Sequence, residues 1–161
     1  MSRMNRSGLA AGVIALTIAA LGLSIQPGNA RAAVDADVRA GIYPNADAVA
    51  VGAGILADMG RNTGWYFNPN IEVAMGDSRD IVAVSGDVHY DFNHTRNTSL
   101  WVGAGPAVLV TNREFGDDET DLGVNVLTGF GARRGSIRPF AQLRGTMSDQ
   151  NQVAIAGGIR F

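Results

Sequence analysis

The feature that most constrains this chain is a period of two in its apolar residues. The last stretch shows it clearly, because Val153, Ile155, Ile159 and Phe161 alternate with small or polar residues. Such alternation predicts a β-strand with one apolar face. A tilted strand of about 9–11 residues is long enough to cross a bilayer. We therefore interpret the stretch as a membrane-spanning β-strand.

The same rhythm recurs along the chain, and turn residues separate the segments. Each segment alone is a weak signal, so the argument depends on their number. Short connections make neighbouring strands antiparallel. We interpret Pro69 as an irregular entrance to its strand, because proline cannot donate a ladder hydrogen bond. The expected strands are residues 34–43, 48–59, 65–76, 81–92, 99–110, 121–132, 137–147 and 152–161.

The N-terminal residues 1–32 have the pattern of a secretory signal peptide. Arg3 and Arg6 give a basic start, residues 8–25 form an apolar run, and residues 30–32 fit a small-x-small cleavage site. An uncleaved anchor helix is the alternative. We expect cleavage, because both a helix breaker and a cleavage pattern follow the run. The domain that remains is residues 33–161.

The composition excludes some classes of protein. Removing the three arginines of the signal leaves 10 basic and 15 acidic residues, a formal charge of −5. An acidic chain without a basic patch does not suit nucleic-acid binding. The chain has no cysteine, so disulfides cannot stabilise this exported domain. A closed ladder of hydrogen bonds in lipid would supply that stability.

Alternation does not by itself say which face points inward. A soluble, lipocalin-like carrier would turn the apolar face in. The polar face is rich in glycine, however, which suits the crowded interior of a narrow barrel. Its acids lie mainly on the first four strands and its arginines mainly on the last two, so they can pair across a lumen. The expected lumen network is Asp35, Asp37, Arg39, Asp58, Glu72, Asp87, His89, Asp91, Arg138, Arg144 and Arg160.

Aromatic residues fall near one level of the predicted barrel, the end that carries both termini. Aromatic side chains prefer the membrane interface. Trp101 and Phe140 alternate in step with the polar, inward-facing residues of their strands, so we expect them to plug the lumen. The expected interface aromatics are Trp65, Phe67, Tyr90, Phe92, Phe130 and Phe161.

With its strand number, signal peptide and terminal Phe161, the chain resembles the OmpA/OmpX-like group of small eight-stranded outer-membrane barrels. The resemblance covers residues 33–161 and departs at Gly157, where the group usually has a larger apolar residue. It implies an all-β, eight-stranded antiparallel up-and-down transmembrane β-barrel in the bacterial outer membrane. It also implies a partner, the barrel-assembly machinery, which would read Val153, Ile155, Ile159 and Phe161.

Three patterns suggest chemistry. His89 shares a strand face with Ser85, Asp87 and Asp91, which is either a catalytic or metal constellation or, as we expect, a lumen hydrogen-bond network. An acidic segment, residues 117–121, offers oxygen ligands for a divalent cation but lacks the glycine spacing of a calcium loop. The glycines and arginines of residues 129–135 precede no expected helix, so they do not form a nucleotide loop.

We therefore expect a non-enzymatic integral outer-membrane protein, monomeric and without a cofactor, with a structural or surface-interaction role and a plugged polar lumen. Its partners would be outer-membrane lipid and the assembly machinery, with surface contacts through the acidic loop, residues 111–120. The alternatives are a narrow channel for small solutes, a lipid-modifying enzyme acting through His89, and the soluble carrier. Eight strands leave little open lumen, which argues against the channel.

Overall fold

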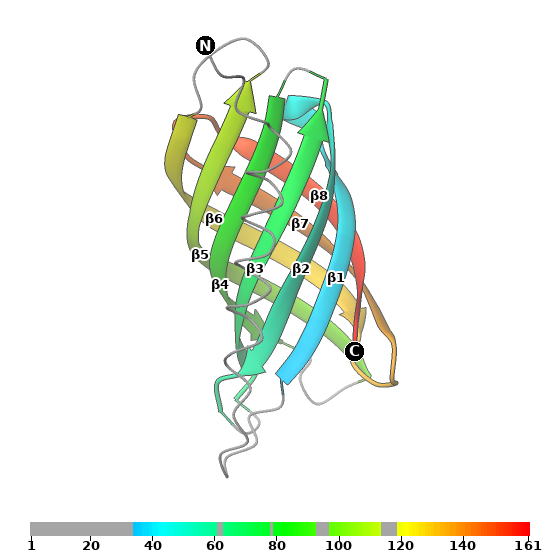
Figure 1. Cartoon of the computed structure of the whole chain (residues 1–161). Helices are drawn as coiled ribbons and strands as arrows, with labels where there is room; N and C mark the ends of the chain where they lie inside the picture. The colour runs from blue at the N-terminus through cyan, green and yellow to red at the C-terminus, as the bar shows by residue number, and fades with distance from the viewer. Residues whose placement is uncertain (1–33, 61–62, 78, 93–96, 114–118) are drawn as a thin grey trace. The chain divides into compact units, whose positions relative to one another are not determined.

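In the computed structural model, the described residues are 34–60, 63–77, 79–92, 97–113 and 119–161, and they form eight β-strands. Each strand is antiparallel to its neighbours in the chain, and β1 also pairs with β8, so the sheet closes in sequence order (Figure 1). The predicted eight-stranded, antiparallel up-and-down barrel is confirmed. The strands are β1 (Val34–Tyr43), β2 (Ala48–Asp58), β3 (Trp65–Gly76), β4 (Arg79–Asp91), β5 (Thr98–Arg113), β6 (Glu119–Ala132), β7 (Arg138–Met147) and β8 (Gln152–Arg160).

The predicted strand bounds fail mainly at the acidic loop. The ladder between β5 and β6 continues to Thr111 opposite Glu119, so the predicted loop of residues 111–120 was too long. The in–out alternation of β5 extends into the predicted loop, where the Thr111 side chain points inward and is buried. Residues 114–118 lie outside the described part. Every other bound agrees with the prediction to within two residues.

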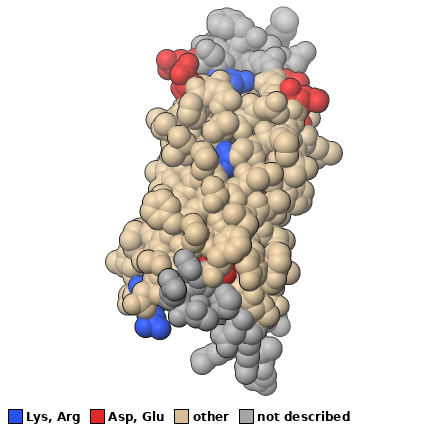
Figure 2. All heavy atoms as spheres, turned by 180° about the vertical axis from the view of Figure 1, so that it is seen from behind, with Lys and Arg blue, Asp and Glu red and all other residues tan. Residues whose placement is uncertain are grey.

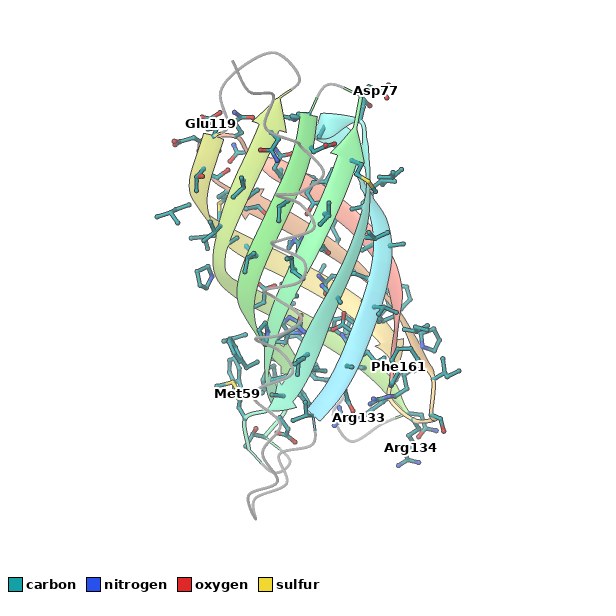
Figure 3. All side chains as sticks on the ribbon, in the orientation of Figure 1. Met59, Asp77, Glu119, Arg133, Arg134 and Phe161 are labelled. Atoms are coloured by element: carbon teal, nitrogen blue, oxygen red, sulfur yellow. The ribbon has the colours of Figure 1, made fainter. Side chains whose placement is uncertain are left out.

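Both ends of the described chain lie at one end of the barrel, here called the termini end. The N–H of Phe161 donates to the carbonyl of Ala36 at 2.9 Å, because an even number of strands brings the last strand back beside the first. The opposite end is called the far end. Met59, Arg133, Arg134 and Phe161 mark the termini end in Figure 3, and Asp77 and Glu119 mark the far end.

Pro69 does not mark an irregular strand entrance, as predicted, but lies inside β3. It pairs with Gly86 of β4, and its register places it opposite Ile55 of β2. A proline there leaves the carbonyl of Ile55 without a ladder donor. The side-chain amide of Asn68 donates to that carbonyl instead, at 2.7 Å. The ladder therefore continues past the proline without a shift in register.

The apolar face of every strand points outward. Val51, Val126 and Ile155, for example, are 53%, 53% and 49% exposed, although all three are central in their strands. From behind, most of the wall is uncharged, and charged side chains gather mainly at the two ends (Figure 2). Within the described part of the chain, no helix is long and apolar enough to cross a membrane. The predicted signal peptide, residues 1–32, lies outside that part.

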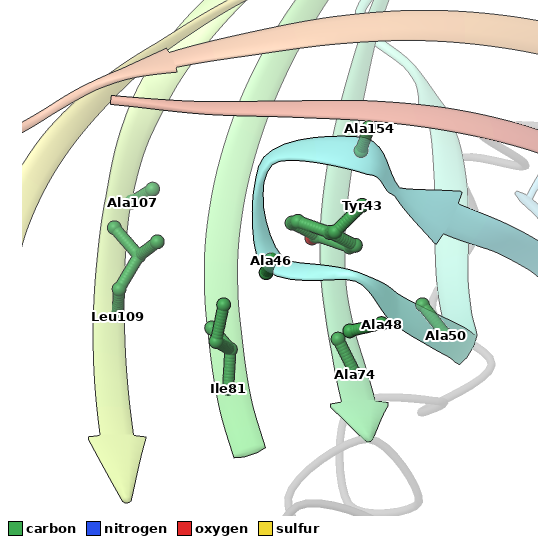
Figure 4. Close-up of a cluster of buried hydrophobic side chains, with 9 residues drawn as sticks. All are labelled: Tyr43, Ala46, Ala48, Ala50, Ala74, Ile81, Ala107, Leu109 and Ala154. Atoms are coloured by element: carbon green, nitrogen blue, oxygen red, sulfur yellow. The ribbon is translucent and has the colours of Figure 1, made fainter. Parts of the chain in front are cut away.

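The interior is filled in layers. At the far end a short 3-10 turn (Pro44–Ala46) follows β1, and Ala46 joins a buried apolar cluster. A second cluster, Trp101, Leu127 and Phe140, lies nearer the termini end. Polar side chains occupy the space between them. The far-end cluster consists of Tyr43, Ala46, Ala48, Ala50, Ala74, Ile81, Ala107, Leu109 and Ala154 (Figure 4).

Glycines make room for the two large rings. A Cβ at Gly158 would lie 2.6 Å from Cζ of Phe140, and a Cβ at Gly129 would overlap the indole of Trp101. Both glycines have inward parity, directly beside the ring that each accommodates. The glycine-rich inward face therefore reflects the crowding expected of a barrel this narrow.

Candidate functional site

The centre of the lumen is held by a buried ion pair that crosses the barrel. Arg144 on β7 donates to the carboxylate of Glu72 on β3. Tyr43 bridges the same two groups, because its hydroxyl donates to Glu72 at 2.8 Å and accepts from Arg144 at 2.7 Å. A buried charge is tolerated only when it is paired and hydrogen-bonded. Strands far apart in the sequence are thus joined through the interior.

A second ion pair lies next to the first, on β1. Arg39 donates to Asp37 through Nε at 2.9 Å and through Nη2 at 2.6 Å. The amide of Asn68 accepts from Arg39 at 3.2 Å and donates to Asp37 at 3.2 Å. Arg39 Nη1 also lies 3.8 Å from Glu72, so the two pairs form one network.

Asp87 lies in a ring of amides and is bonded to no cation among the described ion pairs. Its carboxylate accepts from Asn70 at 3.0 Å and from Asn125 at 2.9 Å. Asn125 also donates to Ser85 at 3.0 Å and accepts from Thr146 at 2.7 Å. This part of the lumen is joined by hydrogen bonds from four strands, β3, β4, β6 and β7.

Below this network, towards the termini end, an arginine lies between aromatic rings. The guanidinium of Arg160 is 4.4 Å from the Trp101 ring centroid and 4.6 Å from that of Phe140. The His89 ring is nearly parallel to that of Trp101, with centroids 6.3 Å apart and planes 5° from parallel. Cation–π contacts of this kind stabilise a desolvated guanidinium. Together these side chains block the lumen.

The termini end of the lumen contains a cavity of about 190 Å³, here called the mouth cavity. Three arginines and three carboxylates line it, together with His89 and Trp101. Arg133 donates to Asp91 at 2.6 Å and to Tyr66 at 2.7 Å, and Arg138 donates to Asp35 at 2.9 Å. The six charged residues are Asp35, Asp58, Asp91, Arg133, Arg138 and Arg160.

The structure places all eleven residues of the expected lumen network on the inward face, but in separate groups. Asp37, Arg39, Glu72, Asp87 and Arg144 lie in the centre. Arg160 and His89 lie at the aromatic layer, and Asp35, Asp58, Asp91 and Arg138 lie around the mouth cavity. Arginines of β7 do meet acids of the early strands, at Glu72 and Asp35.

The sequence analysis did not identify the amides, the tyrosine or Arg133 as parts of this network. The inward parity of Asn68, Asn70 and Asn125 was a usable signal, because an amide on an inward face needs a partner. Arg133 gave no such signal. It lies in a turn, beyond the last residue of β6, and reaches back to Asp91.

Among the described residues, His89 forms no hydrogen bond with the hydroxyl or the carboxylates on its strand face. Its Nε2 has no hydrogen-bond partner. The potential partners on its strand form other hydrogen bonds. Ser85 and Asp87 both accept from Asn125. Asp91 accepts from Ser99 at 2.6 Å. A nucleophile needs a base within hydrogen-bond reach, whereas the neighbour of the His89 ring is the parallel ring of Trp101.

The acidic segment, residues 117–121, falls partly outside the described residues. Asp117 and Asp118 are not described, whereas Glu119 accepts from Gln150 at 2.9 Å and Asp121 is buried in β6. No group of three or more potential metal ligands occurs among the residues with described positions. Residues 129–132 end β6, and Gly135 makes the following turn with φ of +110°.

The six expected interface aromatics point outward near the termini end. Trp65 and Tyr90 are register partners with ring centroids 5.0 Å apart, and Tyr90 lies 5.1 Å from Phe92. Phe130 and Phe161 are more than half exposed. The residues expected to form the assembly signal, Val153, Ile155, Ile159 and Phe161, lie on the outer side of the last strand.

No protein-family model matches the sequence, and no curated protein matches it. Solved structures do resemble it. The N-terminal β-barrel domain of Pseudomonas aeruginosa OprF matches with a TM-score of 0.68 and 16% identity, over 80% of this chain and 95% of that one. Neisserial surface protein A matches with a TM-score of 0.60 and 14% identity, over 79% and 92%. At such low identity the likeness establishes the fold, so this chain has the β-barrel fold of those two proteins.

Proposed function

We propose that the chain is an integral outer-membrane β-barrel protein with a structural or surface-interaction role and no catalytic activity. The observation that carries this is the direction of the two faces. Valines and isoleucines that are 44–60% exposed cover the outside, for example Val49, Val84 and Ile42, while charged residues fill the inside. Such a surface is stable against hydrocarbon and unfavourable in water.

The filled lumen supports a non-conducting role over a channel. Trp101 is 1% and Phe140 6% exposed, and the Glu72–Arg144 pair crosses the interior above them. Planar-bilayer recordings with the purified protein test this point. We expect no discrete conductance steps, and regular steps would favour the narrow channel.

The membrane role is tested by cell fractionation and by gel migration before and after boiling. A folded barrel resists detergent and migrates differently from the boiled chain. We expect the protein in the outer-membrane fraction with heat-modifiable migration. Extraction into buffer without detergent would instead favour a soluble carrier.

The partners follow from the same proposal. Lipid would contact the outward apolar face, with the six aromatics at the interface of the termini end. The assembly machinery would read the last strand through Val153, Ile155, Ile159 and Phe161. Removing Phe161 tests this, with Phe92→Ala as a control for losing an exposed aromatic from the same end. We expect assembly in cells to fall for the first variant only.

A surface role would depend on residues 114–118, which follow Arg113 of β5 and precede Glu119 of β6 in the sequence. Replacing this segment with glycine and serine should leave heat-modifiable migration unchanged and abolish a contact-dependent phenotype. A variant that keeps the phenotype would leave only the structural role.

A further inference from the structure

The mouth cavity adjoins a buried arginine that has no ion-pair partner. The Arg160 residue is 6% exposed, and none of the ion pairs among the described residues includes it. It is the register partner of Arg138 on β7 and of Asp37 on β1. Asp37 is bonded to Arg39, and Arg138 is bonded to Asp35. Three arginines of β1, β7 and β8 therefore share two aspartates of β1, and Arg160 is the arginine left without an ion pair.

The three carboxylates that line the cavity already have donors. Asp35 accepts from Arg138 at 2.9 Å, and Asp58 accepts from the N–H of Gly60 at 2.9 Å. Asp91 accepts from Arg133 and Ser99, both at 2.6 Å. A cation entering the cavity would compete with Arg138 for Asp35 and with Arg133 for Asp91. The cavity chemistry therefore does not favour a positively charged ligand.

The groups that lack partners around the cavity are nitrogens. Nε of Arg160, Nε of Arg138 and Nε1 of Trp101 are buried donors without an acceptor, and Nε2 of His89 also has no partner. The first three can only donate. An unmet buried donor beside an unpaired buried cation is unfavourable. A negatively charged ligand in the cavity would compensate the charge of Arg160.

We propose that the mouth cavity binds a small oxyanion of the phosphate class, with Arg160 as its central cation. Its volume of about 190 Å³ corresponds to roughly six water molecules at about 30 Å³ each. That space takes a tetrahedral oxyanion with some water. Arg133, whose side chain is 28% exposed, stands at the rim, where the approaching anion would meet it first.

The phosphate has two possible sources, a free ion and the headgroup of a lipid beside the rim. Both would present the same oxygens to Arg160. The inference needs only the closed barrel, so its failure would leave the proposed membrane role untouched. Conversely, a protein found outside the membrane would still be expected to bind the free ion.

The full chain, folded in micelles of an uncharged maltoside detergent, provides the test. The chain has two tryptophans, so Trp65→Phe leaves Trp101 as the only one, in the wall of the cavity. Inorganic phosphate is titrated at constant ionic strength against chloride while Trp101 fluorescence is followed. We expect a saturable change with phosphate, and none with chloride.

The variants Arg160→Gln and Arg134→Gln make the test specific. Arg134 is an exposed arginine at the same end and does not line the cavity. Loss of a charged donor is expected to weaken binding about ten-fold or more for Arg160→Gln, with little change for Arg134→Gln. Equal weakening by both variants would overturn the proposal, because it would indicate general attraction to a basic rim.

Two further measurements cover a misfolded variant and the source of the phosphate. If Arg160→Gln loses heat-modifiable migration, Arg133→Gln replaces it, and phosphorus NMR line broadening with the unaltered chain reports binding directly. A phosphate-monoester lipid added to the micelles tests the headgroup. Binding of the free ion, or of the lipid alone, supports the site and identifies its source. No saturable response to either, in fluorescence or in line width, overturns it.

Discussion

At the far end the barrel interior is filled by small apolar side chains, whereas at the termini end it is blocked by two aromatic rings and an arginine. Between this apolar cluster and the centre lies a space of about 10 Å³, lined by Ala50 and Ala154 and also by Arg39 and Glu72. The termini end retains about 190 Å³. Alanines pack closely around Tyr43, while rigid rings leave gaps that charged side chains border. The inward-facing positions of the same strands thus form an apolar cluster towards one end and a polar cavity at the other.

The network between the two ends should give the largest effect when it is broken. Glu72→Leu leaves Arg144 buried without its carboxylate, which typically costs about 3–5 kcal/mol. The measurement is urea unfolding of the barrel refolded into lipid vesicles. The double variant with Arg144→Leu should regain part of this loss, because no unpaired charge remains. A double variant less stable than Glu72→Leu would contradict the role assigned to the pair.

If the two ends differ only on the inside, the cost of an outward charge should depend on depth and not on which end is tested. Val126→Arg, in the middle of β6, should lose about 2–4 kcal/mol of unfolding free energy in vesicles. Leu122→Arg near the far end and Ile137→Arg near the termini end should each lose about 0–1 kcal/mol. Similar losses for all three would argue against a bilayer around this surface.

The crowding at the aromatic layer can be tested on two adjacent glycines of β8. Gly158→Ala places a methyl against Phe140 and the Val38 backbone, so we expect a loss of about 1–3 kcal/mol. Gly157 faces outward, where its Cβ would meet only the Phe140 carbonyl oxygen, at 3.8 Å. Gly157→Ala should therefore be neutral or slightly stabilising. Thermal unfolding of both variants decides, and equal Tm values would show that the rings are not tightly packed.

The smallest effect is expected at the rim of the mouth cavity. Arg133 is partly exposed, and the buried Asp91 keeps its hydrogen bonds from Ser99 and from the N–H of Leu100 when the guanidinium is lost. Arg133→Gln should therefore cost only about 1 kcal/mol, in contrast to the buried pair in the centre. The same unfolding assay measures it. A loss as large as that of Glu72→Leu would mean that the rim is as dry as the centre, and the contrast between the two regions would fail.

Most charged residues of the candidate site could be predicted from the sequence, because the period of two assigns them to the inward face of their strands. The prediction also placed Trp101 and Phe140 inside. It did not identify Arg133, whose side chain reaches back from a turn, where parity has no meaning. It misinterpreted Pro69, because the donor that replaces its missing N–H is the side chain of Asn68.

The sequence by itself determined which residues point into the barrel and which point out, since side-chain direction along a strand follows from local backbone geometry with a period of two. It also determined that the strands are eight and that the termini share one end. Only the tertiary structure decided that Arg144 meets Glu72 and that Arg160 lies between two rings beside a cavity. Those neighbours depend on the depth at which each residue sits, and depth is set by the stagger between strands around the closed barrel.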